Sequence, residues 1–168
     1  LVGSGRAAVR DIAEEVRTRT RIFSTGNASS ASADAQVQQV VGKASAQVYA
    51  AEAAAIRAAH ASQRAYVTRY GKDEQAERDA NIAAELESAQ AQVAIAELVL
   101  RATSDLFNAL GASATSTTKQ LDRHWRNART TASHNPLIYK ERIIGDWEIN
   151  GTEPPYVWQI GGGSKQTA

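Results

Sequence analysis

The segment 121–136, LDRHWRNARTTASHNP, holds the densest set of chemically active side chains in this 168-residue sequence. It contains two of the three histidines, three arginines, a tryptophan and an Asn-Pro pair, whereas most of the preceding chain is alanine, glutamine and small polar residues. Unperturbed histidine titrates close to neutral pH, so it can donate or accept a proton under ordinary conditions. The segment is therefore the first candidate for acid–base chemistry.

A helix is expected from about residue 117 to 133, and it would gather the polar residues of this segment into one stripe. The stripe follows a 3-4-3 spacing: His124, Asn127, Thr131 and His134. Asn135 and Pro136 suit the N-cap and first turn of a following helix over 136–149. His134 would then lie at a helix junction, where the free N–H groups of the second helix favour an anion and a neutral imidazole. A histidine at such a junction can also serve only for capping or packing, and we take His124 as structural.

Composition and charge exclude several classes of function. A net charge of +1, from 19 basic and 18 acidic residues, gives no general attraction to nucleic acid. We therefore expect Arg123, Arg126 and Arg129 to pair with acidic side chains across a bundle. The chain has no cysteine, and His124 and His134 lack the spacing and acidic neighbours of a metal site. No stretch reaches the ~20 apolar residues of a membrane span and no signal-peptide pattern is present, so we expect a cytoplasmic protein without a membrane partner.

Long amphipathic helices must position this segment. Apolar spacing predicts a first helix over about 4–23, followed by a Gly/Ser/Asn loop over 24–33. Asp34 is expected to cap a second helix that runs to about Tyr70. The third helix, about 73–110, has the clearest pattern, an unbroken 4-3-4-3 seam: Ile82, Leu86, Ala89, Val93, Ala96, Leu100, Thr103, Phe107 and Leu110. Such a seam is typical of antiparallel bundles with left-handed packing.

These elements predict an all-α fold, an antiparallel helical bundle with long helices over 1–150 and an extended, partly disordered tail over 151–168. The two longest helices would each measure about 55 Å at ~1.5 Å per residue. Helices of this length need long partners, and the many alanines permit close contact, so we expect the chain to oligomerise. The sequence has no methionine and opens inside a helical pattern. We therefore expect a piece of a longer protein.

The sequence over 121–155, LDRHWRNARTTASHNPLIYKERIIGDWEINGTEPP, resembles the C-terminal signature of acyl-CoA-dehydrogenase-like flavin-dependent monooxygenases of the dibenzothiophene and dimethylsulfone monooxygenase type. The resemblance extends over the whole chain, through RTRTRIF at 17–23 and LGASATS at 110–116. It implies the C-terminal helical bundle of the acyl-CoA dehydrogenase fold, with an N-terminal helical domain and a β-domain elsewhere in the full protein. It also implies a homotetramer.

The activity implied by the resemblance is that of a two-component oxygenase. A separate flavin reductase would deliver reduced flavin, FMN rather than the alternative FAD. The flavin would activate dioxygen as a C4a-(hydro)peroxide and oxygenate a small-molecule substrate. The resemblance implies that His134 is catalytic, lying beside the flavin and stabilising or protonating that adduct. The chain alone is expected to fold and associate without activity, because the other domains would supply most of the flavin pocket.

The resemblance also implies roles for residues outside the histidine junction. In this family an arginine near the end of the first helix binds the flavin phosphate, often of a neighbouring subunit, and Arg19 or Arg21 matches it. Asn127 and Asn135 are the further cofactor-binding candidates. The C-terminal tail tends to fold over the oligomer near the active site, so Tyr156 and Trp158 are candidates to gate it.

Two alternative functions follow from the same residues. Acyl-CoA dehydrogenases have an Arg-Asp-Ala segment followed about eight residues later by the glutamate that abstracts the substrate α-proton. The matching segment here is RNAR at 126–129, and about eight residues on from Asn127 lies the pair His134-Asn135 instead. No carboxylate lies between Asp122 and Glu141, which disfavours dehydrogenation because proton abstraction from carbon needs a base within reach. The second alternative is a non-enzymatic helical oligomerisation module.

Overall fold

The described part of the chain, residues 1–157 of a computed structural model, is built from helices, and it contains no strand. Five α-helices follow in order: α1 Val2–Thr18, α2 Ala35–Thr68, α3 Glu74–Asp105, α4 Arg123–His134 and α5 Leu137–Asn150. Three short 3₁₀ helices lie between them: η1 Ala31–Ala33, η2 Leu106–Ala109 and η3 Ala112–Thr115. The predicted all-α bundle with long helices is confirmed.

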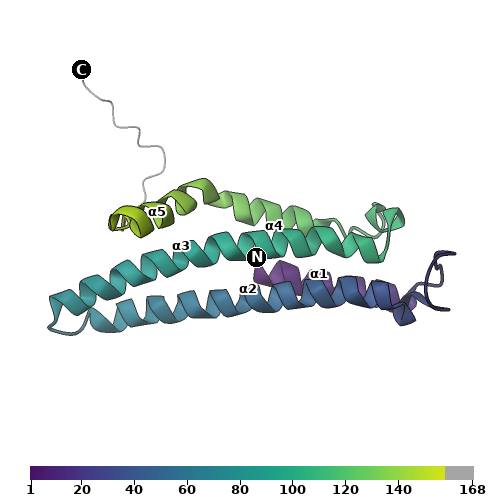
Figure 1. The fold of residues 1–168 in the computed structure, drawn as a ribbon, viewed down its shortest axis with the longest axis horizontal. Coiled ribbons are helices and arrows are strands. Elements are labelled where there is room, and N and C mark those ends of the chain that lie inside the picture. Colours follow the sequence, from purple (N-terminus) through teal and green to yellow (C-terminus); the bar gives the residue numbers. More distant parts are fainter. Residues whose placement is uncertain (158–168) are drawn as a thin grey trace, which may run out of the picture.

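The helices α2 and α3 form a long antiparallel hairpin that organises the molecule (Figure 1). Helix α1 packs against the half of the hairpin nearest the start of α2, while α4 and α5 run back along α3. The junction between α4 and α5 thus lies near the middle of the long axis, close to the N-terminus of α1 (Figure 1). The hairpin is the rigid support on which the junction is held.

Side-chain caps fix where the two long helices begin. The carboxylate of Asp34 accepts hydrogen bonds from the backbone N–H groups of Gln36 and Val37, at 2.8 and 3.4 Å, as predicted for an N-cap. Asp73 caps α3 in the same way, accepting from the N–H of Ala76 at 3.0 Å. Each cap satisfies N–H groups that the first turn of a helix leaves without a partner.

The core lies where α3 is covered on two sides. Ile12 of α1, Val48 of α2 and Leu106 of η2 belong to one buried cluster. A second cluster joins α2, α3 and α4 through Ala51, Val99 and Ala128. Most of the predicted α3 seam is buried, and Ile95, Val99 and Leu106 widen its apolar face. Small residues at the contacts between helices allow the helices to approach closely.

Several helix ends differ from the sequence prediction, including that of α3, which changes to the 3₁₀ helix η2 after Asp105 instead of continuing to residue 110. Helix α1 ends at Thr18 rather than near residue 23, because Arg19 turns away and donates a hydrogen bond to the carbonyl of Leu110. Helix α4 begins at Arg123 rather than near 117, after turns and a 3₁₀ helix. Asn135 does not cap α5. It is extended and its side chain makes no capping bond, and Pro136 immediately precedes the helix.

Candidate functional site

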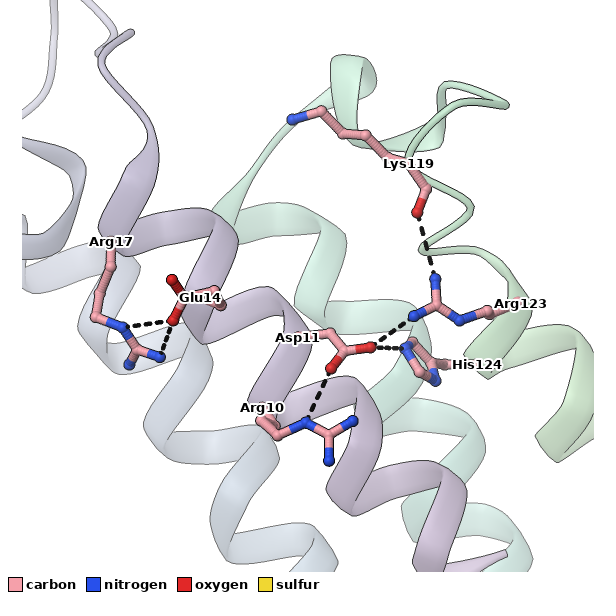
Figure 2. A network of polar contacts seen from close by, with 7 residues as sticks. All are labelled: Arg10, Asp11, Glu14, Arg17, Lys119, Arg123 and His124. Carbon is pink, nitrogen blue, oxygen red and sulfur yellow. Dashed lines mark hydrogen bonds and ion pairs between the residues drawn. The ribbon is translucent and has the colours of Figure 1, made fainter.

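The start of α4 is anchored to α1 by one carboxylate (Figure 2). Oδ2 of Asp11 lies 2.6 Å from Nη2 of Arg123 and 3.0 Å from Nε2 of His124, while Oδ1 accepts from Nε of Arg10 at 3.0 Å. His124 is buried, with 6% of its surface exposed. This contact holds the helix that carries His134 in register with α1, and it gives His124 a structural environment, as expected.

The environment of Asp11 favours its ionised form. Burial alone would raise the pKa of its carboxyl group, but hydrogen bonds and charge interactions with Arg10 and His124 outweigh it and lower that pKa below the ordinary value of 3.8. The predicted pairing of α4 arginines across the bundle is therefore confirmed for Arg123. Arg126 pairs instead with Asp122, one turn before it on the same segment, at 2.9 Å.

The opposite end of α4 opens onto a groove of about 700 Å³. Four elements line it: Leu1, Val2 and Gly3 at the start of α1, Ala55 and Ala58 of α2, Ser88, Ala91, Gln92 and Ile95 of α3, and Thr131, His134 and Asn135 at the α4–α5 junction. The lining is mostly apolar, and it contains no lysine, arginine or carboxylate. Two members of the predicted polar stripe, Thr131 and His134, thus meet in one groove.

His134 is the last residue of α4 and its side chain is exposed. The N-terminal N–H groups of α5, three residues further on, receive no side-chain cap and the first turn of α5 has no acidic residue. Free N–H groups at a helix start attract negative charge. The imidazole lines the groove and the start of α5 lies just outside its lining, so both are candidates to act on an anionic group bound near the junction.

Ser88 and Gln92 are groove residues that the sequence analysis missed. They lie one turn apart on α3, and Nε2 of Gln92 donates a hydrogen bond to the carbonyl of Asn135 at 3.2 Å. This bond links the α4–α5 junction to α3, so it fixes the backbone position from which the His134 side chain extends. Two polar residues spaced by four in an alanine-rich helix were the available signal.

The structure does not bring the other predicted cofactor residues to this groove. Asn127 is exposed and lies two turns before His134, outside the lining. Arg19 and Arg21 follow the end of α1, whereas the start of α1 lines the groove. The 17 residues of α1 span about 25 Å at ~1.5 Å per residue, so both arginines are far from His134 within one chain.

Arg19 and Arg21 also differ in what their side chains do. The guanidinium of Arg19 donates to the carbonyls of Leu110 and Arg21, and so fastens the segment after α1 to the residue that follows η2. Arg21 is exposed, and within the described residues its guanidinium has no hydrogen bond or ion pair. Only Arg21 is available to a ligand without breaking an internal contact.

The tail is held at the far end of the hairpin. Glu153 forms an ion pair with Arg78 near the start of α3, Pro154 is buried, and the hydroxyl of Tyr156 donates to Glu153 at 3.4 Å. The 14 positions from Arg78 to Gln92 correspond to about 21 Å of helix. Tyr156 therefore does not reach the groove of its own chain. Trp158 lies outside the described residues.

Within residues 1–157, no group of three or more potential ligands (His, Cys, Asp or Glu) could hold a metal ion. In the same part of the chain, no helix is long and apolar enough to cross a membrane.

Comparison with known families decides how this bundle is classified. Residues 1–137 match the family described as acyl-CoA dehydrogenase, C-terminal domain. The chain belongs to this family. In this acyl-CoA dehydrogenase C-terminal domain, the matched region includes His134 and ends at the start of α5.

Relatives of this C-terminal domain include monooxygenases. Dibenzothiophene monooxygenase from Mycolicibacterium goodii is 28% identical over 153 residues, which cover 91% of this chain and 36% of that protein. The probable FMNH2-dependent monooxygenase SfnC from Pseudomonas putida is 43% identical over 49 residues, 29% of this chain and 12% of that protein.

Solved structures agree with the fold. The methanesulfinate monooxygenase MsuC from Pseudomonas fluorescens matches with a TM-score of 0.79 at 27% identity, over 92% of this chain and 39% of that one. FMN-bound TdsC from Paenibacillus sp. A11-2 matches with a TM-score of 0.75 at 30% identity, over 91% of this chain and 37% of that one. This chain thus spans well under half the length of the relatives it matches.

Proposed function

We propose that this chain is the C-terminal domain of a cytoplasmic, reduced-flavin-dependent monooxygenase, with the bundle over 1–150 and the tail over 151–168. The enzyme would take reduced FMN from a separate reductase, oxygenate a small molecule, and assemble as a homo-oligomer, a tetramer by resemblance. The names of the relatives support this, since one is FMNH2-dependent and TdsC has been crystallised with FMN and indole. The observation that carries the proposal is His134, exposed at the groove beside the uncapped start of α5.

The groove fits an uncharged ring better than a phosphate. Its lining is mostly small and apolar, with alanines from α2 and α3, and its polar residues include Thr131, Gln92 and His134. No lysine or arginine lines it to balance a phosphate. A flavin or substrate ring would rest against these walls, with the cover coming from another domain.

The flavin phosphate needs a cation, and Arg21 is the candidate with a free guanidinium. Its distance from His134, about 25 Å along α1, is too long for both to touch one flavin near the groove of the same chain. We therefore assign Arg21 to the flavin of a neighbouring subunit. Asn135 can contribute at the groove, whereas the exposed Asn127 would act only if a neighbouring domain closed over it.

When bound, reduced flavin supplies the electrons that activate dioxygen. His134 then has two tasks, which are to hold a proton at Nδ1 or Nε2 close to the reacting oxygen and to release it as the oxygen charge changes. The N–H groups of α5 stabilise negative charge at the same place. Gln92 keeps the junction in position through its hydrogen bond to Asn135.

The absence of a carboxylate from the groove lining favours this function over acyl-CoA dehydrogenation. Abstraction of an α-proton needs a base such as glutamate within hydrogen-bond reach of the substrate. A non-enzymatic oligomerisation module would explain the long helices, but it would leave the exposed histidine in an apolar groove without a role.

The test uses the full-length enzyme with His134→Ala, and Thr130→Ala as the control on an exposed position of the same helix. Reduced FMN is mixed with oxygen and substrate, and both the rate of product formation and the product formed per FMN oxidised are measured. Loss of a proton-transfer group should lower the oxygenation rate on the order of 10²-fold, while Thr130→Ala should behave as the parent. Unchanged coupling in His134→Ala, or reduction of bound flavin by an acyl-CoA thioester, would contradict the proposal.

A further inference from the structure

The groove that holds His134 has two kinds of wall. Its α1 and α2 sides consist of apolar residues and one glycine: Leu1, Val2, Gly3, Ala55 and Ala58. Every polar side chain of the lining comes from α3 or from the α4–α5 junction: Ser88, Gln92, Thr131, His134 and Asn135. None of these is a lysine, arginine or carboxylate. A ligand that fits both walls is therefore uncharged, with one apolar edge and one hydrogen-bonding edge.

The two walls meet on one face of α3. Successive residues of an α-helix are rotated by about 100°, so Ser88 and Gln92 form one row of this face. Ala91 and Ile95 form the row beside it, and both belong to the buried cluster that α3 shares with α2. Gln92 instead bonds the carbonyl of Asn135. The apolar row of α3 thus faces α1 and α2, and the polar row faces the junction.

Ser88 carries a groove hydroxyl that has no partner. The hydroxyl of Thr131 donates to the carbonyl of Asn127 at 2.9 Å. The hydroxyl of Ser88 makes no hydrogen bond within the described residues, although a helical serine can donate to the carbonyl four residues earlier, as Ser62 does. Ser88 is half-buried, and a buried hydroxyl without a partner costs free energy. The Ser88 hydroxyl is therefore available to a molecule in the groove.

Ser88 lies within reach of the same ligand as His134. Helices α4 and α5 run back along α3 (Figure 1), so the contact of Gln92 with Asn135 marks where α4 ends against α3. Ser88 is one turn from Gln92, about 6 Å along α3, on the side toward α5. One molecule of fused-ring size can therefore contact both Ser88 and the junction.

We propose that Ser88 determines substrate specificity by hydrogen bonding the polar edge of an uncharged ring substrate. The apolar edge of the ring rests on Ala55 and Ala58, and the polar edge is held beside His134. This inference rests on the proposed function and adds to it the class of substrate, a fused-ring molecule with a hydrogen-bonding atom on one edge. The groove volume of about 700 Å³ lies within the usual range of small-molecule sites, about 300–1,000 Å³.

The substrate fits this groove better than the flavin does. FMN carries a phosphate, which needs a positively charged partner, and the groove lining has no lysine or arginine. An uncharged substrate needs no such partner. We therefore expect the affinity for FMN not to depend on Ser88.

Binding to the full-length enzyme tests the role of Ser88 without relying on turnover. The probes are uncharged bicyclic molecules of similar size: naphthalene, which has no hydrogen-bonding atom, quinoline, which accepts a hydrogen bond, and indole, which donates one. Dissociation constants are measured for the parent, for Ser88→Ala and for the control Ser104→Ala, an exposed position of the same helix outside the groove. Ser88→Ala should weaken the binding of quinoline or indole about three- to tenfold, the effect of one hydrogen bond. Naphthalene and FMN should bind as to the parent, and Ser104→Ala should change nothing.

Several results would overturn the proposal. Ser88→Ala could lose affinity for naphthalene as much as for the polar probes, bind every probe like the parent, or bind FMN more weakly. A parent enzyme that binds none of the probes would overturn it as well. The anion 2-naphthoate tests the absence of charge, and it should bind at least about tenfold more weakly than quinoline, because no lysine or arginine lines the groove. Tighter binding of 2-naphthoate than of quinoline would contradict the uncharged class.

The apolar wall gives a second measurement. Ala58→Leu places a larger side chain where the ring would rest, and Ala59→Leu, at the next and exposed position of α2, is the control. Ala58→Leu should weaken all three uncharged probes about tenfold, with an unchanged circular dichroism spectrum and unchanged FMN affinity. Equal binding by Ala58→Leu and Ala59→Leu would overturn the proposal. The oxygenase function is judged by product coupling in His134→Ala, so a failure of either proposal is recognised on its own.

Discussion

The two histidines of α4 show how neighbours decide what a side chain can do. His124 is buried and bound to Asp11, so its imidazole serves the contact between α1 and α4. His134 lies at the other end of the helix, exposed, in a groove without carboxylates. The same residue type on one helix is thus buried and ion-paired at one end and exposed in a mostly apolar groove at the other.

Asp11 should stabilise the fold in a pH-dependent way. Asp11→Asn removes the charge that holds Arg123 and His124, and we expect a loss of about 1–2 kcal/mol in the free energy of unfolding at neutral pH. The folded-state pKa of Asp11 is lowered below 3.8, so its contribution is present above that pH and is lost as pH falls through the folded value. Urea denaturation of both proteins from pH 7 to pH 3 should show the difference shrinking in acid.

Asp122→Asn is the matched control, because Asp122 is 43% exposed in its pair with Arg126. An exposed pair of this kind contributes only about 0.3–0.5 kcal/mol. A loss from Asp122→Asn as large as that from Asp11→Asn, or a difference that grows in acid, would mean that the Asp11 contact is not the anchor of α4.

Variants of Arg19 and Arg21 should have different effects, the first on stability and the second on ligand binding. In the full-length enzyme, Arg21→Ala should weaken FMN binding about tenfold or more, the effect of one charged hydrogen bond, with little change in the melting temperature. Arg19→Ala should instead lower the melting temperature, because Arg19 fastens the segment after α1 to Leu110. Fluorescence titration with FMN and thermal melting measure the two effects. An Arg21→Ala enzyme that binds FMN like the parent would remove Arg21 from the cofactor site.

At the scale of elements, the close approach of α1 to the hairpin depends on a glycine. A Cβ on Gly5 would lie 2.8 Å from Cγ2 of Val48 and 3.5 Å from Cγ1 of Val99. Valine in a helix has little freedom to rotate away. Alanine at this position therefore cannot be accommodated unless α1 moves.

Gly5→Ala should accordingly destabilise the protein, although alanine is the better helix former. We expect a net loss of about 1–2 kcal/mol, since overpacking costs about 1–3 kcal/mol and the helix propensity returns at most about 1 kcal/mol. Gly145→Ala on α5 is the control, because nothing lies within 4 Å of its added Cβ, and it should stabilise slightly. Thermal melts followed by circular dichroism compare them. If both variants stabilise equally, α1 is less closely packed than described.

Local signals were sufficient to predict the long helices and insufficient to predict their ends. The spacing of apolar residues predicted the seam of α3, and Asp34 was recognised as a cap because its type and position act locally. The end of α1 depends on Arg19 reaching Leu110, which is 91 positions away in the chain. No local pattern contains that contact.

The part of the site that lies on one helix was predictable from the sequence, whereas the part that depends on contact between several helices was not. His134 and Thr131 share a stripe that can be counted in the sequence. Ser88 and Gln92 join them only because α4 ends beside that turn of α3. Asn135 was expected to cap α5, but the residue before a proline is held extended and Pro136 leads into the helix instead.

At the scale of the whole molecule, the functional candidates lie at three separate places along one rod. The groove with His134 is near the middle, Arg21 lies beyond one end of α1, and the tail with Tyr156 is fastened near the tip of the α2–α3 hairpin. Tyr156 could therefore gate a site only in another subunit.

The length of α1 has a consequence for the enzyme in dilute solution. If one chain supplies the proton-exchanging imidazole and another supplies the guanidinium for the same flavin, a single chain contributes to two sites but completes neither. Catalytic output per molecule would then fall as the enzyme is diluted, and a chain lacking His134 mixed with one lacking Arg21 would recover part of the activity that neither has alone.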